Sequence, residues 1–221
     1  MSKWEYGGVY KKHDMSGIIE VPGGTLKVHD IFEPLPDFMK RADCIFCDPP
    51  CSLGNLNTFY TKADRTDYKK EYMPFAKRLF ECIDEINPKH VFIEVFKSNN
   101  AIITHMLHGR FQYIKIYETT YYHNKKNRCW VVAASHEPLP DYPFNGMDEE
   151  DVIYYIGQHV QYTCIGDLCM GRGLVGKAAL AAGKPYVGTE LNEKRLAILV
   201  DYAKKCYNID LVSKTTKKGM I

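Results

Sequence analysis

An apolar run that two consecutive prolines close is the strongest local constraint in this sequence. Cys44–Cys47 reads Cys-Ile-Phe-Cys, a short β-prone stretch that is typical of a buried strand. Pro49 and Pro50 cannot donate to a sheet and they fix φ of the outgoing chain, so the strand must end at Asp48. The carboxylate and the neighbouring fixed carbonyl are two acceptors that could hold an amino group. An ordinary Asp-Pro turn after a core strand is the alternative interpretation.

Strand and helix patterns alternate along most of the remaining chain. The strands are predicted at 25–29, 43–47, 91–95, 113–121, 129–134, 162–166 and 185–190. The helices are predicted at 72–86, 98–107, 148–159, 174–182 and 193–207. This order predicts an α/β fold, a doubly wound and mostly parallel sheet with one antiparallel hairpin. In such sheets ligands bind at the carboxyl ends of the strands, where Asp48 is placed.

Length, composition and charge narrow the class of protein. At 221 residues, with 45% hydrophobic and 25% charged residues, the chain suits one globular domain with a substantial core. A formal net charge of +2 gives no general attraction for nucleic acid, so such a role must depend on local basic patches. Nothing resembles a signal peptide or a long apolar span, which favours a cytoplasmic protein with no membrane contact.

The eight cysteines are predicted to be reduced thiols. Cys44 and Cys47 form a C-x-x-C pair, but on a strand an odd separation sends their side chains to opposite faces. No second matching pair exists elsewhere in the sequence, so no metal site is predicted.

Two polar segments are candidates for contact with nucleic acid. Residues 52–72 are predicted to form a loop that interleaves aromatic and basic side chains, among them Phe59, Tyr60, Lys62 and Arg65. Residues 124–127 are predicted to form a hairpin turn, in which Lys125, Lys126 and the adjacent Arg128 could grip phosphates. The alternatives are a solvated loop and an exposed basic hairpin tip without function.

A glycine-rich turn follows the strand predicted at 162–166. Gly171, Gly173 and Gly176 match G-x-G-x-x-G, and Glu190 lies 19 residues beyond Gly171, where its carboxylate could accept ribose hydroxyls. Only about thirty residues follow this pattern, too few to complete an ordinary dinucleotide domain. Asp167 precedes the loop, where it could pair with the α-ammonium of S-adenosylmethionine, whereas a pyrophosphate would be repelled.

Together, Asp48-Pro49-Pro50-Cys51 and Asp167-Leu168-Cys169-Met170-Gly171-Arg172-Gly173 resemble the motifs of the amino-methyltransferases that modify exocyclic amines of DNA bases. The catalytic motif precedes the cofactor motif, which is similar to the circularly permuted, beta-type order. The resemblance implies a seven-stranded Rossmann-like methyltransferase sheet. It also implies S-adenosylmethionine as cofactor and adenine N6 in DNA as the preferred target.

The resemblance and the polar segments together define three sets of site residues. The catalytic set is Asp48, Pro49, Pro50 and Cys51; the cofactor set is Asp30, Asp167, Cys169, Met170, Gly171, Gly173, Glu190 and Asn192; the substrate set is Phe59, Tyr60, Lys62, Arg65, Lys125, Lys126 and Arg128. One domain is expected over 1–221: an N-terminal segment (1–24), a catalytic-motif half (25–134), a connector (135–147), a cofactor-binding half (148–210) and a solvated tail (211–221).

Two departures from the family pattern keep alternatives open. Cys51 stands where the family has an aromatic that stacks on the flipped base, and the 135–147 connector is too short for a separate target-recognition domain. Cytosine N4, RNA or protein remain alternative substrates, and a homodimer could supply recognition. A non-catalytic nucleic-acid-binding module and a nicotinamide-dependent oxidoreductase are the alternatives from other classes.

Overall fold

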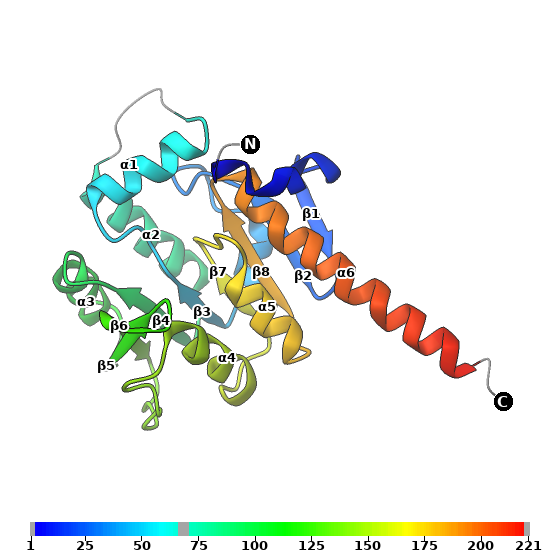
Figure 1. Ribbon diagram of the computed structural model, residues 1–221. Helices are drawn as coiled ribbons and strands as arrows, with labels where there is room; N and C mark the ends of the chain where they lie inside the picture. Colours follow the sequence, from blue (N-terminus) through cyan, green and yellow to red (C-terminus); the bar gives the residue numbers. More distant parts are fainter. Residues whose placement is uncertain (1–2, 66–70, 219–221) are drawn as a thin grey trace.

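The computed structural model describes residues 3–65 and 71–218 and contains one mixed sheet (Figure 1). Its strands are β1 (Ile18–Val21), β2 (Gly24–Val28), β3 (Cys44–Cys47), β4 (His90–Val95), β5 (Tyr113–Tyr121), β6 (Asn124–Ser135), β7 (Ile165–Asp167) and β8 (Tyr186–Glu190). The strand order is β1-β2-β8-β7-β3-β4-β6-β5. Strands β2, β8, β7, β3 and β4 run parallel to one another, whereas β1 and β6 are antiparallel to their neighbours. The doubly wound α/β prediction is confirmed, with eight strands in place of seven.

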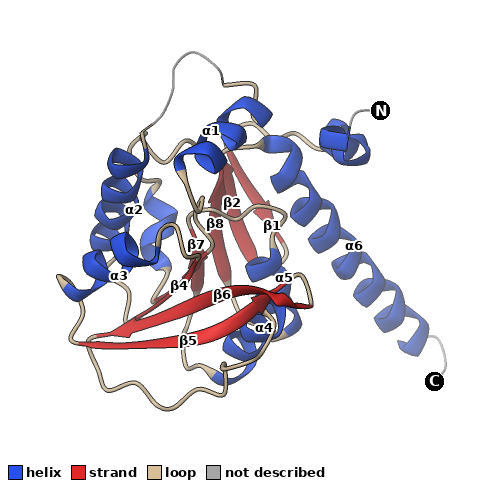
Figure 2. Cartoon of the chain, turned by 60° about the vertical axis from the view of Figure 1, so that its left-hand side comes forward, coloured by secondary structure: helices blue, strands red, loops and turns tan. Residues whose placement is uncertain are grey.

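Helices cover both faces of the sheet, as Figure 2 shows. The α-helices are α1 (Leu53–Lys62), α2 (Tyr72–Ile86), α3 (Asn100–His108), α4 (Glu149–His159), α5 (Leu174–Ala181) and α6 (Glu193–Lys218), and the 3-10 helices are η1 (Lys3–Lys12) and η2 (Asp37–Arg41). Helices α4, α5 and α6 pack on one face, and α1, α2 and α3 contribute to the core on the other. None of the helices among the described residues is long and apolar enough to cross a membrane.

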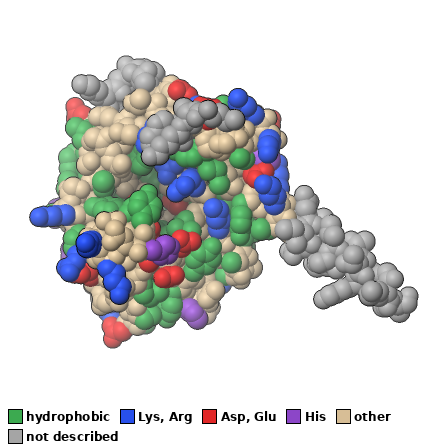
Figure 3. Space-filling view, viewed as in Figure 1, with side chains coloured by type: hydrophobic (Ala, Val, Ile, Leu, Met, Phe, Trp, Pro, Cys, Tyr) green, Lys and Arg blue, Asp and Glu red, His purple; other side chains and the backbone are tan. Residues whose placement is uncertain are grey.

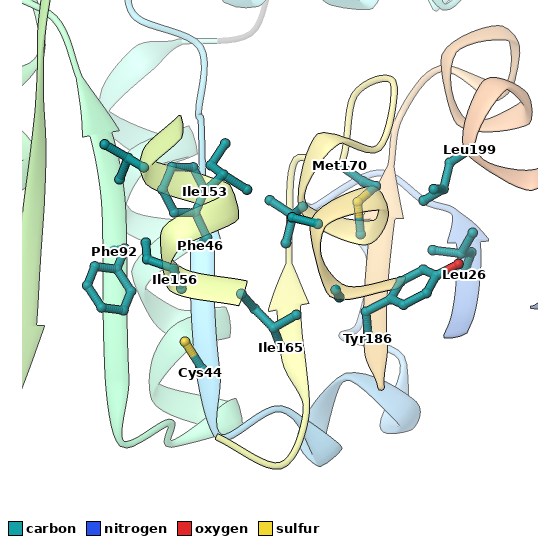
Figure 4. Close-up of a cluster of buried hydrophobic side chains, with 14 of the residues drawn as sticks. Leu26, Cys44, Phe46, Phe92, Ile153, Ile156, Ile165, Met170, Tyr186 and Leu199 are labelled. Carbon is teal, nitrogen blue, oxygen red and sulfur yellow. The ribbon is translucent and has the colours of Figure 1, made fainter. Parts of the chain in front are cut away.

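Strand alternation divides the apolar side chains between two cores. Cys44 and Phe46 of β3 join the core beneath α4 and α5 (Figure 4). Ile45 and Cys47 join the core beneath α2. The two cysteines of the C-x-x-C pair therefore lie on opposite faces, as their spacing predicts. All eight cysteines are free thiols; five of them are buried, and Cys51, Cys169 and Cys206 are partly exposed.

Three sequence predictions of local structure are wrong. Residues 53–62 form helix α1 in place of a loop, because Ser52 caps its first turn by accepting a hydrogen bond from Asn55 N at 3.2 Å and because Leu56 and Tyr60 are buried four residues apart. Residues 66–70 of that predicted loop lie outside the described residues. The hairpin turns at Tyr122 and His123, so residues 124–128 belong to strand β6. Helix α6 continues to Lys218, past the predicted start of the tail at 211.

Strand β1 was not predicted, because Pro22-Gly23-Gly24 marked this region only as turns. The exposed and buried positions of β1 alternate, and Val21 pairs with Gly24 across a tight hairpin. Gly24 is the first residue of β2 and lies opposite Tyr186 of β8, where a Cβ would overlap the Tyr186 ring. The ring can therefore lie against β2 only because the residue is glycine. The hairpin thereby adds an antiparallel edge next to the parallel strands.

Candidate active site

The acids of both sequence motifs lie at the carboxyl edge of the parallel strands. Strand β3 pairs with β7 (Ile45 opposite Gly166), and β7 pairs with β8 (Asp167 opposite Gly188). Asp48 follows β3 directly, Asp167 ends β7 and Glu190 ends β8. Two motifs more than a hundred residues apart in the sequence are therefore brought to one edge of the sheet.

Asp48 is held on stiff backbone but leaves its carboxylate available. Pro49 and Pro50 are buried, whereas Asp48 is exposed to solvent. Within residues 3–65 and 71–218, no donor is hydrogen-bonded to its carboxylate. Surrounding protein atoms raise the pKa of Asp48 to about 6, against the opposing effect of the Arg195 guanidinium. Such a carboxylate, without a protein partner, can accept hydrogen bonds from a ligand.

Two hydrogen bonds to side chains outside it hold the turn that follows Pro50. Cys51 N donates to Asn55 Oδ1 at 3.2 Å, and Ser98 Oγ donates to Cys51 O at 2.7 Å. Asn55 belongs to α1 and Ser98 precedes α3. The backbone beside Asp48 is therefore positioned before any ligand arrives, which is the arrangement that a catalytic carboxylate needs.

The glycine loop has the backbone geometry of a ligand-binding turn. Gly171 (φ 55°) and Gly173 (φ 81°) occupy the left-handed region, and a Cβ at Gly173 would collide with the side chain of Leu199. Gly171 N donates to Glu190 Oε2 at 2.7 Å, and Asn192 N donates to Glu190 Oε1 at 3.0 Å. Thr189 O accepts from Met170 N at 2.9 Å. The end of β8 thus holds the loop close against the sheet.

The buried acids around this loop favour a ligand that carries positive charge and hydroxyl groups. Asp167 is 4% exposed and Glu190 is 6% exposed. Burial raises the pKa of Asp167, and the neighbouring Asp48 and Glu190 act in the same direction, whereas the hydrogen bond from Cys169 N, at 2.8 Å, opposes it. The ammonium and the ribose hydroxyls of S-adenosylmethionine donate hydrogen bonds, and the carboxylates of Asp167 and Glu190 would accept them.

Helix α1 lies across the carboxyl ends of β2 and β8 (Figure 2). Tyr60 is buried, and its hydroxyl donates to Asp30 Oδ1 at 2.6 Å. The carbonyl of Lys62 accepts from Asn192 Nδ2 at 2.8 Å, and the Phe59 ring centroid lies 4.8 Å from Cζ of Arg195. The structure therefore brings Tyr60 and Lys62 against Asp30 and Asn192 of the predicted cofactor set, and Phe59 against Arg195.

Asp30 and Arg65, two further residues of the predicted sets, lie in the same region. Arg65 Nη1 lies 3.6 Å from Asp30 Oδ2 and 3.6 Å from Glu33 Oε1. Phe32 N also donates to Asp30 Oδ1, at 3.1 Å. Asp30 is thus a buried acceptor held by α1 and by its own turn.

The structure adds residues near Asp48 that the sequence analysis missed. Glu94 of β4 is 1% exposed, and its Oε1 has no hydrogen-bond partner among the described residues. Burial and the neighbouring Asp48 both raise the pKa of Glu94 and of Tyr121. The Tyr121 ring meets the Phe96 ring edge-on at 5.4 Å. An acid within the otherwise apolar strand His90–Val95 was the available signal, whereas nothing in the sequence connected Tyr121 with Asp48.

The predicted basic residues are exposed on the strand that follows the hairpin turn. Lys125, Lys126 and Arg128 are all exposed, and Arg128 Nη1 lies 3.2 Å from Glu118 Oε1 of the paired strand. Figure 3 shows Lys and Arg side chains over the part of the surface that Figure 1 assigns to β5 and β6. The hairpin therefore presents positive charge to solvent on β6, just after the turn that follows Tyr121.

Comparisons of sequence find no relative: no family model matches the chain, and neither does any curated protein. Solved structures do match. M1.HpyAVI in complex with SAM superposes with a TM-score of 0.54 at 15% identity, over 78% of this chain and 96% of that one. TTHA0409, a candidate DNA modification methylase from Thermus thermophilus, gives 0.56 at 13% identity, over 81% and 94%. The PvuII cytosine-N4-specific DNA methyltransferase gives 0.52 at 11% identity, over 82% and 89%. The chain therefore has a fold that resembles SAM-dependent DNA amino-methyltransferases.

Proposed function

We propose that this protein transfers a methyl group from S-adenosylmethionine to an exocyclic amine of a DNA base, with adenine N6 as the preferred target. One observation supports the proposal above all: Asp48 and the glycine loop with its acids Asp167 and Glu190 lie at the same edge of the sheet. Asp48 has no hydrogen-bond donor among the described residues. S-adenosylmethionine supplies an already activated methyl group, so the protein's main task is to position the amine.

Asp48 and the carbonyl of Pro49 would hold the two N–H groups of the target amine. Accepting both hydrogens draws the nitrogen lone pair out of conjugation with the base and toward the methyl donor. The Asp48 carboxylate has no hydrogen bond to a described residue that this contact would have to replace, and Pro49 and Pro50 limit its movement. After the transfer, the surplus proton of the amine can pass to the Asp48 carboxylate, which the pKa of about 6 allows.

A base in a duplex would have to leave the stack to reach Asp48. The partly exposed aromatic pair of Tyr121 and Phe96 is the candidate surface for that base, in the place of the aromatic that Cys51 does not provide. Lys125, Lys126 and Arg128 would contact phosphates, which position the duplex without reading its sequence. Phe59, Tyr60 and Lys62 are better explained as the cover of the cofactor site, given their contacts with Arg195, Asp30 and Asn192.

The test is incubation with methyl-labelled S-adenosylmethionine and mixed-sequence duplex DNA, followed by digestion to nucleosides and mass spectrometry. We expect label in N6-methyladenine, and none with Asp48→Asn. Label in N4-methylcytosine would correct the base, and label found only in RNA or protein would overturn the DNA assignment. Cofactor binding without turnover on any of these substrates would instead support a non-catalytic binding module, which the presence of Cys51 makes the second candidate.

A further inference from the structure

Arg195 lies between the glycine loop and helix α1, and nothing so far explains its role. It belongs to the first turn of α6 and is partly buried. A Cβ placed on Gly171 would lie 2.8 Å from its Nη2, and its Cζ lies 4.8 Å from the centroid of the Phe59 ring. The guanidinium is thus stacked under α1 and directed at the loop that the proposed cofactor must contact.

The guanidinium has five N–H donors but makes no hydrogen bond or ion pair with any described residue. Other arginines of the chain are paired: Arg110 Nε lies 2.8 Å from Asp84 Oδ1, and Arg78 Nη1 lies 2.8 Å from Glu85 Oε1. Its charge acts at a distance instead, because it lowers the pKa values of Asp48 and Asp167 against the opposing effect of the protein atoms that surround them. A partly buried guanidinium without an acceptor is costly, and a bound anion would remove that cost.

The methionine end of S-adenosylmethionine carries a positive ammonium and a negative carboxylate, which Asp167 and Arg195 could bind. Its ammonium suits the buried carboxylate of Asp167. Its α-carboxylate would be repelled by Asp167 and Glu190 unless a cation stood beside the loop. We propose that Arg195 receives the α-carboxylate of S-adenosylmethionine while Asp167 receives the ammonium; this inference rests on the proposed function and names a binding residue of the same site. The planar fork of the guanidinium matches the two carboxylate oxygens.

Binding calorimetry with four ligands tests the proposal without any need for activity. S-adenosylmethionine and S-adenosylhomocysteine both carry the carboxylate, decarboxylated S-adenosylmethionine lacks it, and 5′-methylthioadenosine lacks the whole amino-acid end. We expect Arg195→Gln to weaken binding of the first two by about 10- to 100-fold, the effect of losing a charged hydrogen-bond partner. Binding of the last two should change less than about twofold. Arg195→Lys should fall between Gln and wild type, because a point charge replaces the fork.

Two variants serve as controls. Lys205→Gln removes an exposed positive charge ten residues further along helix α6, outside the glycine loop, and should leave all four affinities unchanged. Asp167→Asn should weaken S-adenosylmethionine and decarboxylated S-adenosylmethionine alike, because both retain the ammonium.

Three results would overturn the proposal. Arg195→Gln could bind S-adenosylmethionine more tightly than wild type, which would mean that the Arg195 guanidinium repels the positively charged sulfonium. It could lose 5′-methylthioadenosine equally, which would make it a structural support of the loop. It could bind all four ligands as wild type does. Failure of the wild-type protein to bind either S-adenosylmethionine or S-adenosylhomocysteine would instead remove the proposed function, and this inference with it.

Discussion

The two sides of the candidate site are built in opposite ways. Asp48 is exposed and has no hydrogen-bond donor among the described residues, whereas Asp167 and Glu190 are buried and accept hydrogen bonds from the amides of Cys169, Gly171 and Asn192. Stiffness at Asp48 comes from two prolines, and stiffness at the glycine loop comes from backbone hydrogen bonds to side chains. The carboxylate that we propose to act on a substrate thus has no hydrogen-bond donor within residues 3–65 and 71–218. The acids that we propose to shape the binding loop accept hydrogen bonds from the protein itself.

The sharpest test of this contrast is Asp48→Asn. Because no donor in the described part of the chain is hydrogen-bonded to the carboxylate, the substitution should leave the melting temperature within about 2 °C. It should nevertheless reduce methyl transfer by about 10²- to 10⁴-fold. Transfer rates, thermal unfolding and cofactor affinity would be measured together. Asp37→Asn, which removes an exposed partner of Lys40, is the matched control and should keep full activity. Turnover retained in Asp48→Asn would move the chemistry elsewhere.

Gly173→Ala should have the largest effect on stability. A Cβ there would collide with Leu199, and alanine disfavours φ of 81°. We expect a loss of about 2–5 kcal/mol, measured by chemical denaturation. Gly54→Ala is the control: its Cβ would meet nothing within 4 Å, and in helix α1 the change should add about 0.5–1 kcal/mol. Equal effects of the two substitutions would show that the loop is not held as tightly as the contrast requires.

Glu190→Ala should affect binding and folding at once, unlike Asp48→Asn. It leaves the amides of Gly171 and Asn192 without their acceptor and removes the proposed partner of the ribose. The expected results are a stability loss of about 1–3 kcal/mol and cofactor binding weaker by about 10- to 100-fold. Asp167→Ala should likewise weaken cofactor binding. Unchanged affinity in both variants, by calorimetry, would place the cofactor outside the glycine loop.

Glu94→Gln should change the free energy of unfolding least among these variants, and only at higher pH. The carboxyl of Glu94 faces Asp48, which follows β3, Cys129 of β6, Tyr121 of β5, and Asp148 and Glu149 at the start of α4. Burial raises the pKa of Glu94 above 4.5, so the folded protein keeps a proton that the unfolded chain releases as the pH rises through 4.5.

Wild-type stability therefore falls above that pH, whereas glutamine does not titrate. The variant should match wild type near pH 4 and be more stable than wild type near pH 8. Denaturation curves at the two pH values measure this difference. A variant that is destabilised at both would mean that Glu94 is ionised and paired in the folded protein.

The features that the sequence predicted correctly depend on short-range rules. Two prolines end β3 whatever surrounds them, and a glycine loop between a strand and a helix needs positive φ wherever it occurs. Alternation of apolar runs was sufficient to place five of the helices and to predict a doubly wound sheet. These features also placed Asp48, Asp167 and Glu190 at the same sheet edge.

Helix α1 shows where local rules were not sufficient. Its sequence, Leu-Gly-Asn-Leu-Asn-Thr-Phe-Tyr-Thr-Lys, has weak helix propensity, and the helix is stabilised by the Ser52 cap and by burial of Leu56 and Tyr60 against the body of the protein. The hydrogen bond from Tyr60 to Asp30 joins residues 30 positions apart, so no local pattern reveals it. Because residues 53–62 form a helix, Phe59 contacts Arg195 and the carbonyl of Lys62 accepts a hydrogen bond from Asn192, at the edge of the proposed cofactor site.

The hairpin turn is the clearest case in which tertiary structure decided the outcome. Tyr122 and His123 both have positive φ, although glycine or asparagine is the usual residue for such a turn. His123 N donates to Asp148 Oδ2 at 2.6 Å, and Tyr122 N donates to Glu149 Oε2 at 3.1 Å, so two acids at the start of α4 hold the strained turn. Sequence alone predicted the two acidic motifs and the order of the elements apart from β1, α1 and the two 3-10 helices. The position of this turn, the cover formed by α1 and the place of Arg195 depend on contacts between distant residues, which only the folded chain brings together.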